Sequence, residues 1–412
     1  MPPSLHAVLG ASSAHRWLAC PPSARLCERL ASRFGEGTSP YAQEGTKAHA
    51  LAELKVRFAV YEADGMTASK HSRMSQAEQE QYPGINKFRY ETLRAELGDI
   101  PDDMEYATDI YRAFILGRYE QAKEDDPSAK IYLEQRLDYS KWVPSGFGTG
   151  DALIVSNVFL DVCDYKHGKG VPVKAEGNPQ LRLYGLGALA KFGALYDFPA
   201  VRTTIIQPRL ESISDETVNR LELLDWATTE VEPKAKLAWA GGGDFCPGEH
   251  CRFCAAKAIC SARVAEGMKM FRYGLQNPGV IPDEQIPEIL KTLDAAEEWI
   301  HDIRAYAENQ ATRGQVWRGW KLVRGKKPNR KWSSPEEVKA QLLRAGYAAE
   351  QFETTQLRPV GEVEKALGKK AFSALLGGLV SQGEGRLTLV SEDDKRAEYA
   401  SADADFDDLL SE

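Results

Sequence analysis

The 412-residue sequence lacks the long apolar segments of membrane proteins and the cysteine pattern of secreted ones. No apolar run reaches the roughly 18–20 residues that a membrane-spanning helix needs. The opening stretch MPPSLHAVLGASSAHRW lacks the charged and apolar regions of a signal peptide. Seven cysteines, an odd number with four of them between Cys246 and Cys260, do not suggest a disulfide framework. We therefore expect a cytoplasmic protein with no membrane partner and with a metal or cluster site.

An excess of positive charge is also absent, because 52 Lys and Arg stand against 60 Asp and Glu, for a formal net charge of -8. That balance excludes a histone-like DNA wrapper, but it does not exclude nucleic-acid binding through a local basic patch. Hydrophobic residues make up 43% of the chain and charged residues 27%, which indicates a globular protein with a sizeable core. The length corresponds to two or three domains at about 150 residues each.

Hydrophobic periodicity predicts helices in the first third of the chain and a sheet in the middle. A helix that opens at Asp102 and Asp103 places Met104, Ala107, Tyr111, Phe114 and Ile115 on one face. Short β-branched or alternating runs separated by turn residues then predict strands at Lys130–Leu137, Ala152–Ser156, Val158–Lys166 and Val201–Pro208. A helix is expected between the last two, at Pro179–Phe192.

These patterns predict an α/β protein in five segments. They are a helical N-terminal part (1–124), a core with the crowded cysteines (125–268), a long amphipathic helix (269–312), a basic, Trp-rich α/β appendage (313–400) and an acidic tail (401–412).

The central segment SGFGTGDALIVSNVFLDVCDYKHGKG has the pattern of a hairpin in which Ser156 and Asn157 form the turn. Side chains alternate across a strand, so Asp164 and Lys166 share a face and Asp151 arrives from the paired strand. Two carboxylates can hold Mg²⁺, and a lysine can orient water or offset charge that develops on a phosphate. The alternative is a surface salt bridge in a β-hairpin.

Four further residues stand before or after this segment in the chain. His49, in EGTKAHALAE, is a possible imidazole ligand on a predicted helix, although a lone helical histidine is more often a core or surface residue. Glu134 lies in the predicted strand IYLEQRL, where it could equally pair with Arg136. Gln180 and Tyr184 are spaced i, i+4 on one helix face.

The order His, Glu, G-x-G-D, D-Y-K, Q-x-x-x-Y over residues 10–265 resembles the RecB-like branch of the PD-(D/E)XK nuclease superfamily. The resemblance implies a restriction-endonuclease-like core, a mixed sheet flanked by helices. It implies that His49, Asp151 and Asp164 bind Mg²⁺ or Mn²⁺ and that Lys166 is catalytic. The catalytic set that it implies comprises Glu134, Asp151, Asp164, Lys166, Gln180 and Tyr184.

The segment FCPGEHCRFCAAKAIC contributes four thiols, Cys246, Cys251, Cys254 and Cys260. The C-x2-C-x5-C spacing is too tight for a paired-knuckle zinc ribbon, and no H-x3-5-H partner follows it. Four thiolates at such spacing suit an iron–sulfur cluster. Structural Zn²⁺ is the alternative, and His250 leaves a mixed Cys/His site open. Cys27 and Cys163 are expected to be ordinary buried thiols.

The cysteine pattern resembles that of AddB-type and CRISPR-adaptation nucleases, in which an upstream cysteine joins C-x2-C-x5-C downstream on a 4Fe-4S cluster. In HRWLACPPSARL the matching residue is Cys20, which makes the implied ligand set Cys20, Cys251, Cys254 and Cys260, with Cys246 as the alternative fourth ligand. The whole arrangement also resembles an uncharacterised phage-borne family assigned to this nuclease branch. For a phage-encoded protein, the location would be the host cytoplasm.

Between Arg313 and Trp332 there are eight Lys or Arg, three Trp and no Asp or Glu. Basic side chains with interleaved aromatics suit a single-stranded nucleic acid, because charges follow phosphates and indoles stack on bases. The candidate contacts are Trp317, Trp320, Lys326, Lys327, Arg330 and Lys331. The alternative is a solvated strand pair whose tryptophans fill a small core.

The terminus ADADFDDLLSE carries five acidic residues around Phe406, Leu409 and Leu410. It is either a solvated tail or a peptide that docks onto a single-strand-binding protein or another replication or recombination partner.

Together these features predict a metal-dependent DNA nuclease, an exonuclease on DNA ends or single strands in phage-type recombination or replication. The alternative is a DNA-binding recombination or replication accessory protein with a structural metal cluster. A pure binding module would not need Asp151, Asp164 and Lys166 together.

Overall fold

The computed structural model describes residues 7–34, 40–75, 78–79, 82–157, 159–270, 282–327, 329–352, 357–391 and 396–399. The chain divides into two compact units, Met1–Gly279 and Val280–Glu412. Across the described residues, we find no helix with the length and apolar character that crossing a membrane requires. The acidic tail at 401–412 lies outside the described residues.

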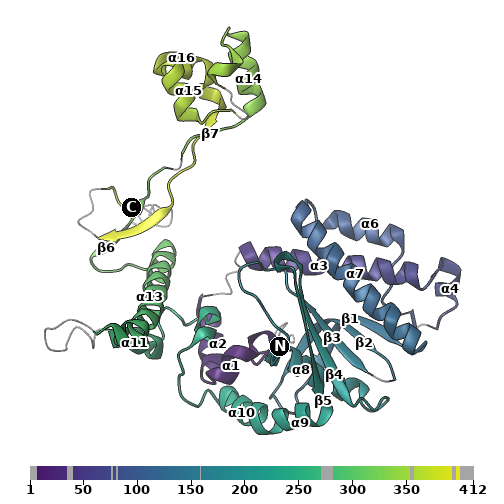
Figure 1. Ribbon diagram of the computed structural model, residues 1–412. Coiled ribbons are helices and arrows are strands. Elements are labelled where there is room, and N and C mark those ends of the chain that lie inside the picture. The colour runs from purple at the N-terminus through teal and green to yellow at the C-terminus, as the bar shows by residue number, and fades with distance from the viewer. Residues whose placement is uncertain are drawn as a thin grey trace, which may run out of the picture. The chain divides into compact units, whose positions relative to one another are not determined.

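A five-stranded mixed sheet forms the centre of the first unit (Figure 1). Its strands lie in chain order: β1 (Lys130–Asp138), β2 (Phe147–Val155), β3 (Leu160–Tyr165), β4 (Ala200–Gln207) and β5 (Ser212–Asn219). Neighbouring strands are antiparallel except β3 and β4, which are parallel. A parallel pair needs a crossover connection, and helix α8 (Pro179–Phe192) provides it.

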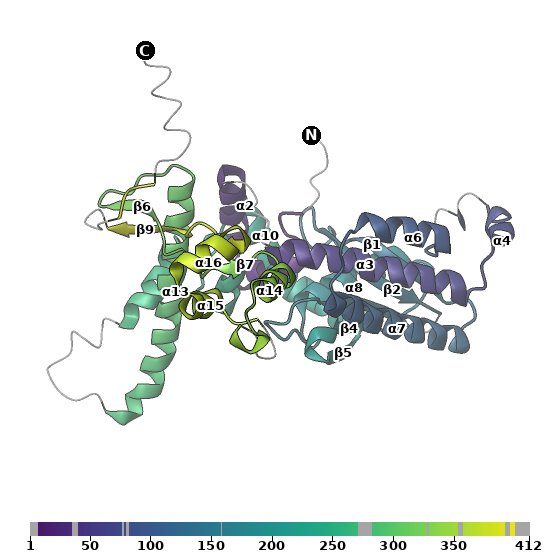
Figure 2. The same ribbon diagram turned by 90° about the horizontal axis from the view of Figure 1, so that it is seen from above.

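Helices cover both faces of this sheet. On one face, Leu183 of α8 belongs to the same buried cluster as Leu153 and Val162 of the strands. On the other face, α3 (Pro40–Ala63) and α7 (Asp102–Asp125) lie side by side (Figure 2). Tyr111 of α7 and Tyr165 of β3 share the second cluster. The predicted mixed α/β architecture, a sheet flanked by helices, is confirmed.

The remaining helices of the first unit are short. They are α1 (Ala14–Ala19), α2 (Ser23–Phe34), α4 (Ala68–Ser72), α6 (Lys87–Glu96), α9 (Arg220–Trp226), α10 (Glu232–Ala240) and α11 (Ser261–Gly267). Helix α1 ends at Ala19, just before Pro21 and Pro22, which cannot continue a helix. Ser13 stands at its N-cap, but the Ser13 hydroxyl donates to the carbonyl oxygen of Gly10 instead of capping the helix.

Strand β5 was not predicted from the sequence. Its residues SISDETVN are polar on one face, and Val218 alone is fully buried among them. As the last strand of the sheet, β5 needs few apolar side chains, so its sequence resembles a loop.

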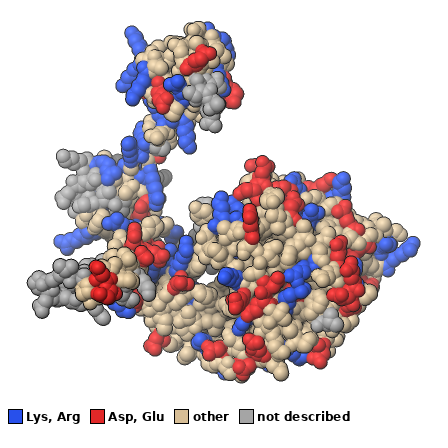
Figure 3. Space-filling view, in the orientation of Figure 1, with Lys and Arg blue, Asp and Glu red and all other residues tan. Residues whose placement is uncertain are grey.

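The second unit contains the long helix α13 (Ile286–Thr312) and the predicted small α/β appendage. Strand β6 (Trp320–Arg324) pairs with β9 (Leu387–Ser391), and β7 (Lys331–Trp332) pairs with β8 (Val380–Ser381). Helices α14 (Pro335–Arg344), α15 (Val360–Leu367) and α16 (Lys369–Leu376) enclose a small core that includes Leu342, Val363 and Phe372. Lys and Arg side chains are scattered over the described surface of this unit, with some Asp and Glu among them, on the face in Figure 3.

Candidate functional site

The two aspartates and the lysine of the predicted hairpin meet on adjacent strands. Ala152 pairs with Cys163 in the β2–β3 ladder, which places Asp151 next to Asp164. Lys166 Nζ lies 2.8 Å from Asp164 Oδ2. Asp151 Oδ2 accepts a hydrogen bond from the backbone N–H of Tyr165 at 2.7 Å. Strand alternation thus brings both carboxylates and the ammonium group together.

His49 reaches the same site from helix α3. Its Nδ1 lies 3.4 Å from Asp151 Oδ2, and its ring packs edge-on against the Tyr165 ring at a centroid distance of 5.3 Å. The helix is anchored on both sides of His49. Buried Lys55 binds Glu105 of α7 at 2.9 Å, and Arg209, which follows β4, donates to Glu44 at 2.7 Å.

Gln180 connects the lysine to one aspartate. Its Oε1 accepts a hydrogen bond from Lys166 Nζ at 3.1 Å, and its Nε2 donates to Asp164 Oδ1 at 3.1 Å and to the Tyr184 hydroxyl at 3.3 Å. Asn178 fixes the start of α8, because its side-chain oxygen accepts from the backbone N–H of Gln180. The structure thus brings six predicted side chains together: His49, Asp151, Asp164, Lys166, Gln180 and Tyr184.

Burial and the neighbouring charges set the protonation of this cluster. Burial opposes the charged form of His49, but the Asp151 carboxylate outweighs it and raises the pKa of His49. His49 in turn lowers the pKa of Asp151 against the effect of burial. Burial, with the Asp151 charge nearby, raises the pKa of Asp164 even beside Lys166. The charged form of Asp164 is therefore unfavourable beside Asp151, and a bound cation would stabilise it.

Among the predicted catalytic residues, Glu134 has a strained backbone conformation. It has a φ of 49°, in the left-handed region, and the β1–β2 ladder pairs Leu133 and Gln135 but skips Glu134. Such backbone strain costs on the order of 1–3 kcal/mol and is concentrated at functional sites. Although Glu134 is an exposed residue of the strand, desolvation by the groups around its carboxyl and the charges of Asp151 and Glu53 raise its pKa to about 7.

A cavity of about 500 Å³ adjoins these groups, lined by His49, Glu53 and Glu134 together with Gly45 and Thr46. Glu53 was missed by the sequence analysis. The signal was present, because Glu53 follows His49 by four residues and therefore shares its helix face.

The residues fit a hard divalent cation. In the described chain, Asp164 Oδ2 is buried and accepts no hydrogen bond, although the Lys166 ammonium group pairs with it. Carboxylate oxygens and a neutral imidazole are suitable donors for Mg²⁺ or Mn²⁺. An ion would have to pull these donors closer together, since within the described ranges no group of three or more His, Cys, Asp or Glu is close enough to hold one.

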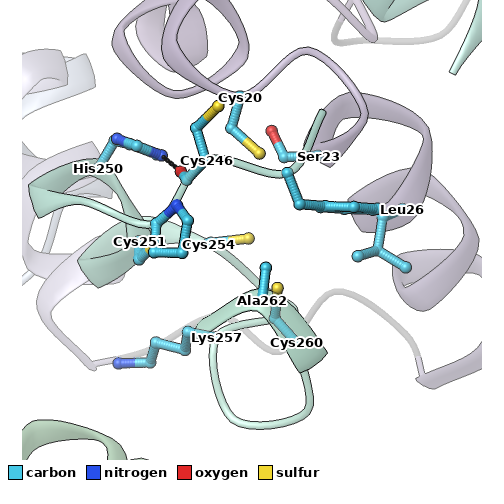
Figure 4. A pocket seen from close by; sticks show the side chains of 12 residues that line it. Cys20, Ser23, Leu26, Cys246, His250, Cys251, Cys254, Lys257, Cys260 and Ala262 are labelled. Carbon is cyan, nitrogen blue, oxygen red and sulfur yellow. Dashed lines mark hydrogen bonds between the residues drawn. The ribbon is translucent and has the colours of Figure 1, made fainter. Parts of the chain in front are cut away.

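A second cluster, the cysteine pocket, lies elsewhere in the first unit (Figure 4). Its lining includes Cys20, Cys246, Cys251, Cys254 and Cys260. Cys20, which follows α1, is buried and lies close enough to Cys251 to affect its protonation, whereas Cys246 is exposed. His250 donates its Nε2 hydrogen to the carbonyl oxygen of Cys246 at 2.8 Å. Thiolates are the donors that zinc and iron–sulfur clusters use, so the donor set fits either group.

The prediction that Cys27 is an ordinary buried thiol is wrong. Cys27, on α2, is half-buried, and its Sγ lies 3.6 Å from Cys254 Sγ. The hydrogen bond with Cys254, aided by Arg16 and the backbone N–H groups of Ala255 and Ala256, lowers the pKa of Cys27 to about 6. Cys163 is buried in β3, as predicted.

Comparison with known protein families shows to which family this chain belongs. A family model described as "Protein of unknown function (DUF2800)" matches residues 6–397. The chain belongs to this family. A solved structure described as "Crystal structure of SSO0001" is similar over 52% of this chain and 94% of that chain, at 17% identity and a TM-score of 0.23.

This DUF2800 chain also carries the predicted basic, Trp-rich segment, and its residues have different environments. Trp320 is 52% exposed. Trp317 is half-buried and donates its indole N–H to the carbonyl oxygen of Ala307 at 2.9 Å. Trp332 packs on Phe372 in the small core. Lys326, Lys327 and Lys331 are exposed, whereas Arg330 pairs with Glu364.

Proposed function

We propose that this protein is a metal-dependent nuclease that hydrolyses phosphodiester bonds in DNA. The observation that carries the proposal is the convergence of Asp151, Asp164, Lys166 and His49, from one hairpin and a helix, into one partly buried site. Gln180 joins this constellation by hydrogen bonds to Lys166 and Asp164. The motif order and the mixed sheet support a restriction-endonuclease-like core in the RecB-like branch.

Each residue then has a distinct role. Asp151, Asp164 and His49 would hold Mg²⁺ or Mn²⁺, which when bound polarises a phosphate and acidifies water. Lys166, kept in place by Asp164 and Gln180, orients the attacking water or offsets charge on the phosphate. Glu134 and Tyr184 complete the set: Glu134 lines the adjoining cavity, and the Tyr184 hydroxyl accepts from Gln180.

The expected substrate is DNA with free ends or single strands, in phage-type recombination or replication. The exposed Trp320 and the exposed lysines Lys326, Lys327 and Lys331 support this choice, because stacking and phosphate contacts favour unpaired strands. The same surface also favours the second candidate, a DNA-binding accessory protein that does not cut.

Incubation with end-labelled single- and double-stranded DNA in Mg²⁺, Mn²⁺ or EDTA tests the proposal. We expect cleavage with either metal and none with EDTA. Asp164→Asn should lower the cleavage rate more than about 100-fold. Loss of an outer partner of a metal site costs up to about 100-fold, and Asp164 would bind the metal directly. Asp138→Asn, at the exposed end of β1, is the matched control and should cleave normally. DNA binding without cleavage in every metal would favour the accessory role instead.

The DNA surface can be tested separately. Trp320→Ala should weaken single-strand binding by about 1–3 kcal/mol without changing the salt dependence. Replacing Lys326, Lys327 and Lys331 with alanine should instead lower the salt slope by roughly 0.7 for each lost phosphate contact. Trp332→Phe is the control, because Trp332 is half-buried against the small core, and it should leave the binding constant unchanged. Titration of tryptophan fluorescence with an oligonucleotide measures all three, and unchanged binding in the first two variants would make this segment structural.

A further inference from the structure

Cys27 and Cys254 are 227 positions apart in sequence, yet their sulfur atoms are 3.6 Å apart. The surroundings of Cys27 are those of a thiolate. The backbone N–H groups of Ala255 and Ala256 donate to its sulfur, and the Arg16 guanidinium is close enough to favour its negative charge. Metal-bound cysteines need this kind of environment, because the thiolate is the ligand.

The helix that carries Cys27 is held firmly at this position. Arg25 of α2 donates its Nε hydrogen to the carbonyl oxygen of Trp239 at 2.7 Å, and its guanidinium stacks on the Trp239 ring at 4.2 Å. Arg16 donates to the carbonyl oxygen of Ser23 at the start of α2. The approach of Cys27 to Cys254 therefore follows from the packing of α2.

The distance between the two sulfur atoms indicates which kind of metal centre the two thiolates could bind. Two thiolates on one tetrahedral ion, each at about 2.3 Å from the metal, lie about 3.8 Å apart. In a four-iron cluster each cysteine binds a different iron, so the cluster holds the thiolates farther apart. In a zinc site or a two-iron cluster, two cysteines share one metal ion.

We propose that Cys27 is a ligand of the metal centre in the cysteine pocket and that it shares one metal ion with Cys254. The inference rests on the proposed cysteine-ligated centre, but not on nuclease activity. The other ligands come from Cys20, Cys251 and Cys260, which line the pocket; Cys20 and Cys260 both lie close enough to Cys251 to affect its charge. The occupant is then Zn²⁺ or a 2Fe-2S cluster instead of the 4Fe-4S cluster that the cysteine spacing suggested.

Metal analysis of protein purified without oxygen tests the assignment. Zinc without iron, or two irons with two acid-labile sulfides, is expected for the unaltered chain. Cys27→Ala should lose most of this metal, whereas the control Cys163→Ala, in the sheet core, should retain it. Full metal content and an unchanged absorption spectrum in Cys27→Ala would overturn the proposal. Four irons with four sulfides in the unaltered chain would contradict the proposal that Cys27 and Cys254 bind the same metal ion.

A second measurement does not depend on a variant that folds. The unaltered protein is treated with iodoacetamide before and after removal of its metal by a chelator, and the Cys27 peptide is followed by mass spectrometry. We expect protection of Cys27 in the metal-loaded protein and alkylation after chelation. Equal alkylation in both states would show that Cys27 is no ligand. Neither measurement reads DNA cleavage, so a failure of the nuclease proposal would appear separately.

Discussion

At the carboxylate–lysine site, Asp151, Asp164 and Lys166 come from two adjacent strands of one hairpin. In the cysteine pocket, by contrast, Cys20 and Cys27 must meet a segment that begins more than 200 residues later. The first site depends on strand alternation, whose period is two residues wherever a strand forms. The second depends on the packing of α1 and α2 against the later parts of the first unit. The difference separates a site that local structure builds from one that tertiary structure builds.

The two sites should also differ in what a bound metal does for the fold. The hairpin aspartates are held by backbone and side-chain hydrogen bonds from Tyr165 and Gln180. A metal in the cysteine pocket would link the N-terminal helices to the 246–260 segment, so its binding free energy would add to the free energy of unfolding. Metal removal should therefore stop catalysis at one site and destabilise the chain at the other.

The largest expected effect is on stability. Cys20→Ala should lose the metal of the cysteine pocket and lower the free energy of unfolding by about 2–5 kcal/mol, the range for a lost covalent cross-link. Cys246 is exposed, so Cys246→Ala should leave metal content and stability nearly unchanged. Metal analysis with thermal unfolding compares the two variants. If Cys246→Ala loses the metal and Cys20→Ala keeps it, Cys246 is a ligand in place of Cys20.

Loss of the lysine should affect turnover and leave stability intact. Lys166→Gln is expected to lower the cleavage rate by about 10²–10³-fold, because an aligned charge at the reacting phosphate is lost. Its affinity for Mn²⁺ should fall little, since the aspartates remain. Lys174→Gln, an exposed neighbour, is the control. Single-turnover cleavage and Mn²⁺ titration are the measurements, and a parallel loss of metal affinity would make Lys166 part of the metal-holding structure.

Gln180 should have an intermediate effect, because it acts through Lys166 and Asp164. Gln180→Leu is expected to lower cleavage by about 10–100-fold, as outer partners of metal sites do. Tyr184→Phe removes one acceptor of the Gln180 amide and should cost less. Cleavage rates across a range of metal concentrations would show whether the loss lies in metal binding or in turnover. Equal losses in both variants would contradict this ordering.

The smallest expected effect concerns Glu134, whose folded-state pKa is raised to about 7. A raised carboxyl pKa makes the ionised form unfavourable in the folded protein, so stability falls as the pH rises from about 4.5 to 7. With a chelator present, Glu134→Gln should unfold at a higher temperature than the unaltered chain at pH 8. Below pH 4.5 the difference should vanish, because Glu134 is protonated in both states. A difference that does not change with pH would assign the effect to packing.

Much of the fold could be predicted from residue patterns. The helix at Pro179–Phe192 and the strand that begins at Lys130 have strong local signals, and both are present with nearly the predicted bounds. Strand β5 could not be predicted, because an edge strand buries few apolar side chains. The strained backbone of Glu134 could not be predicted either, since it arises where β1 and β2 fail to pair.

The sequence by itself determined that Asp164 and Lys166 share a strand face and that Gln180 and Tyr184 share a helix face, because strand and helix periods convert residue spacing directly into shared faces. That these two faces meet was implied by the resemblance to the nuclease branch. The sequence also determined that the crowded cysteines are more suited to a metal than to disulfides. Tertiary structure alone decided that the helix face of His49 and Glu53 lies beside Glu134 and that Cys27 contacts Cys254. Such contacts join elements far apart in the chain, and local periodicity does not specify which distant surfaces will pack together.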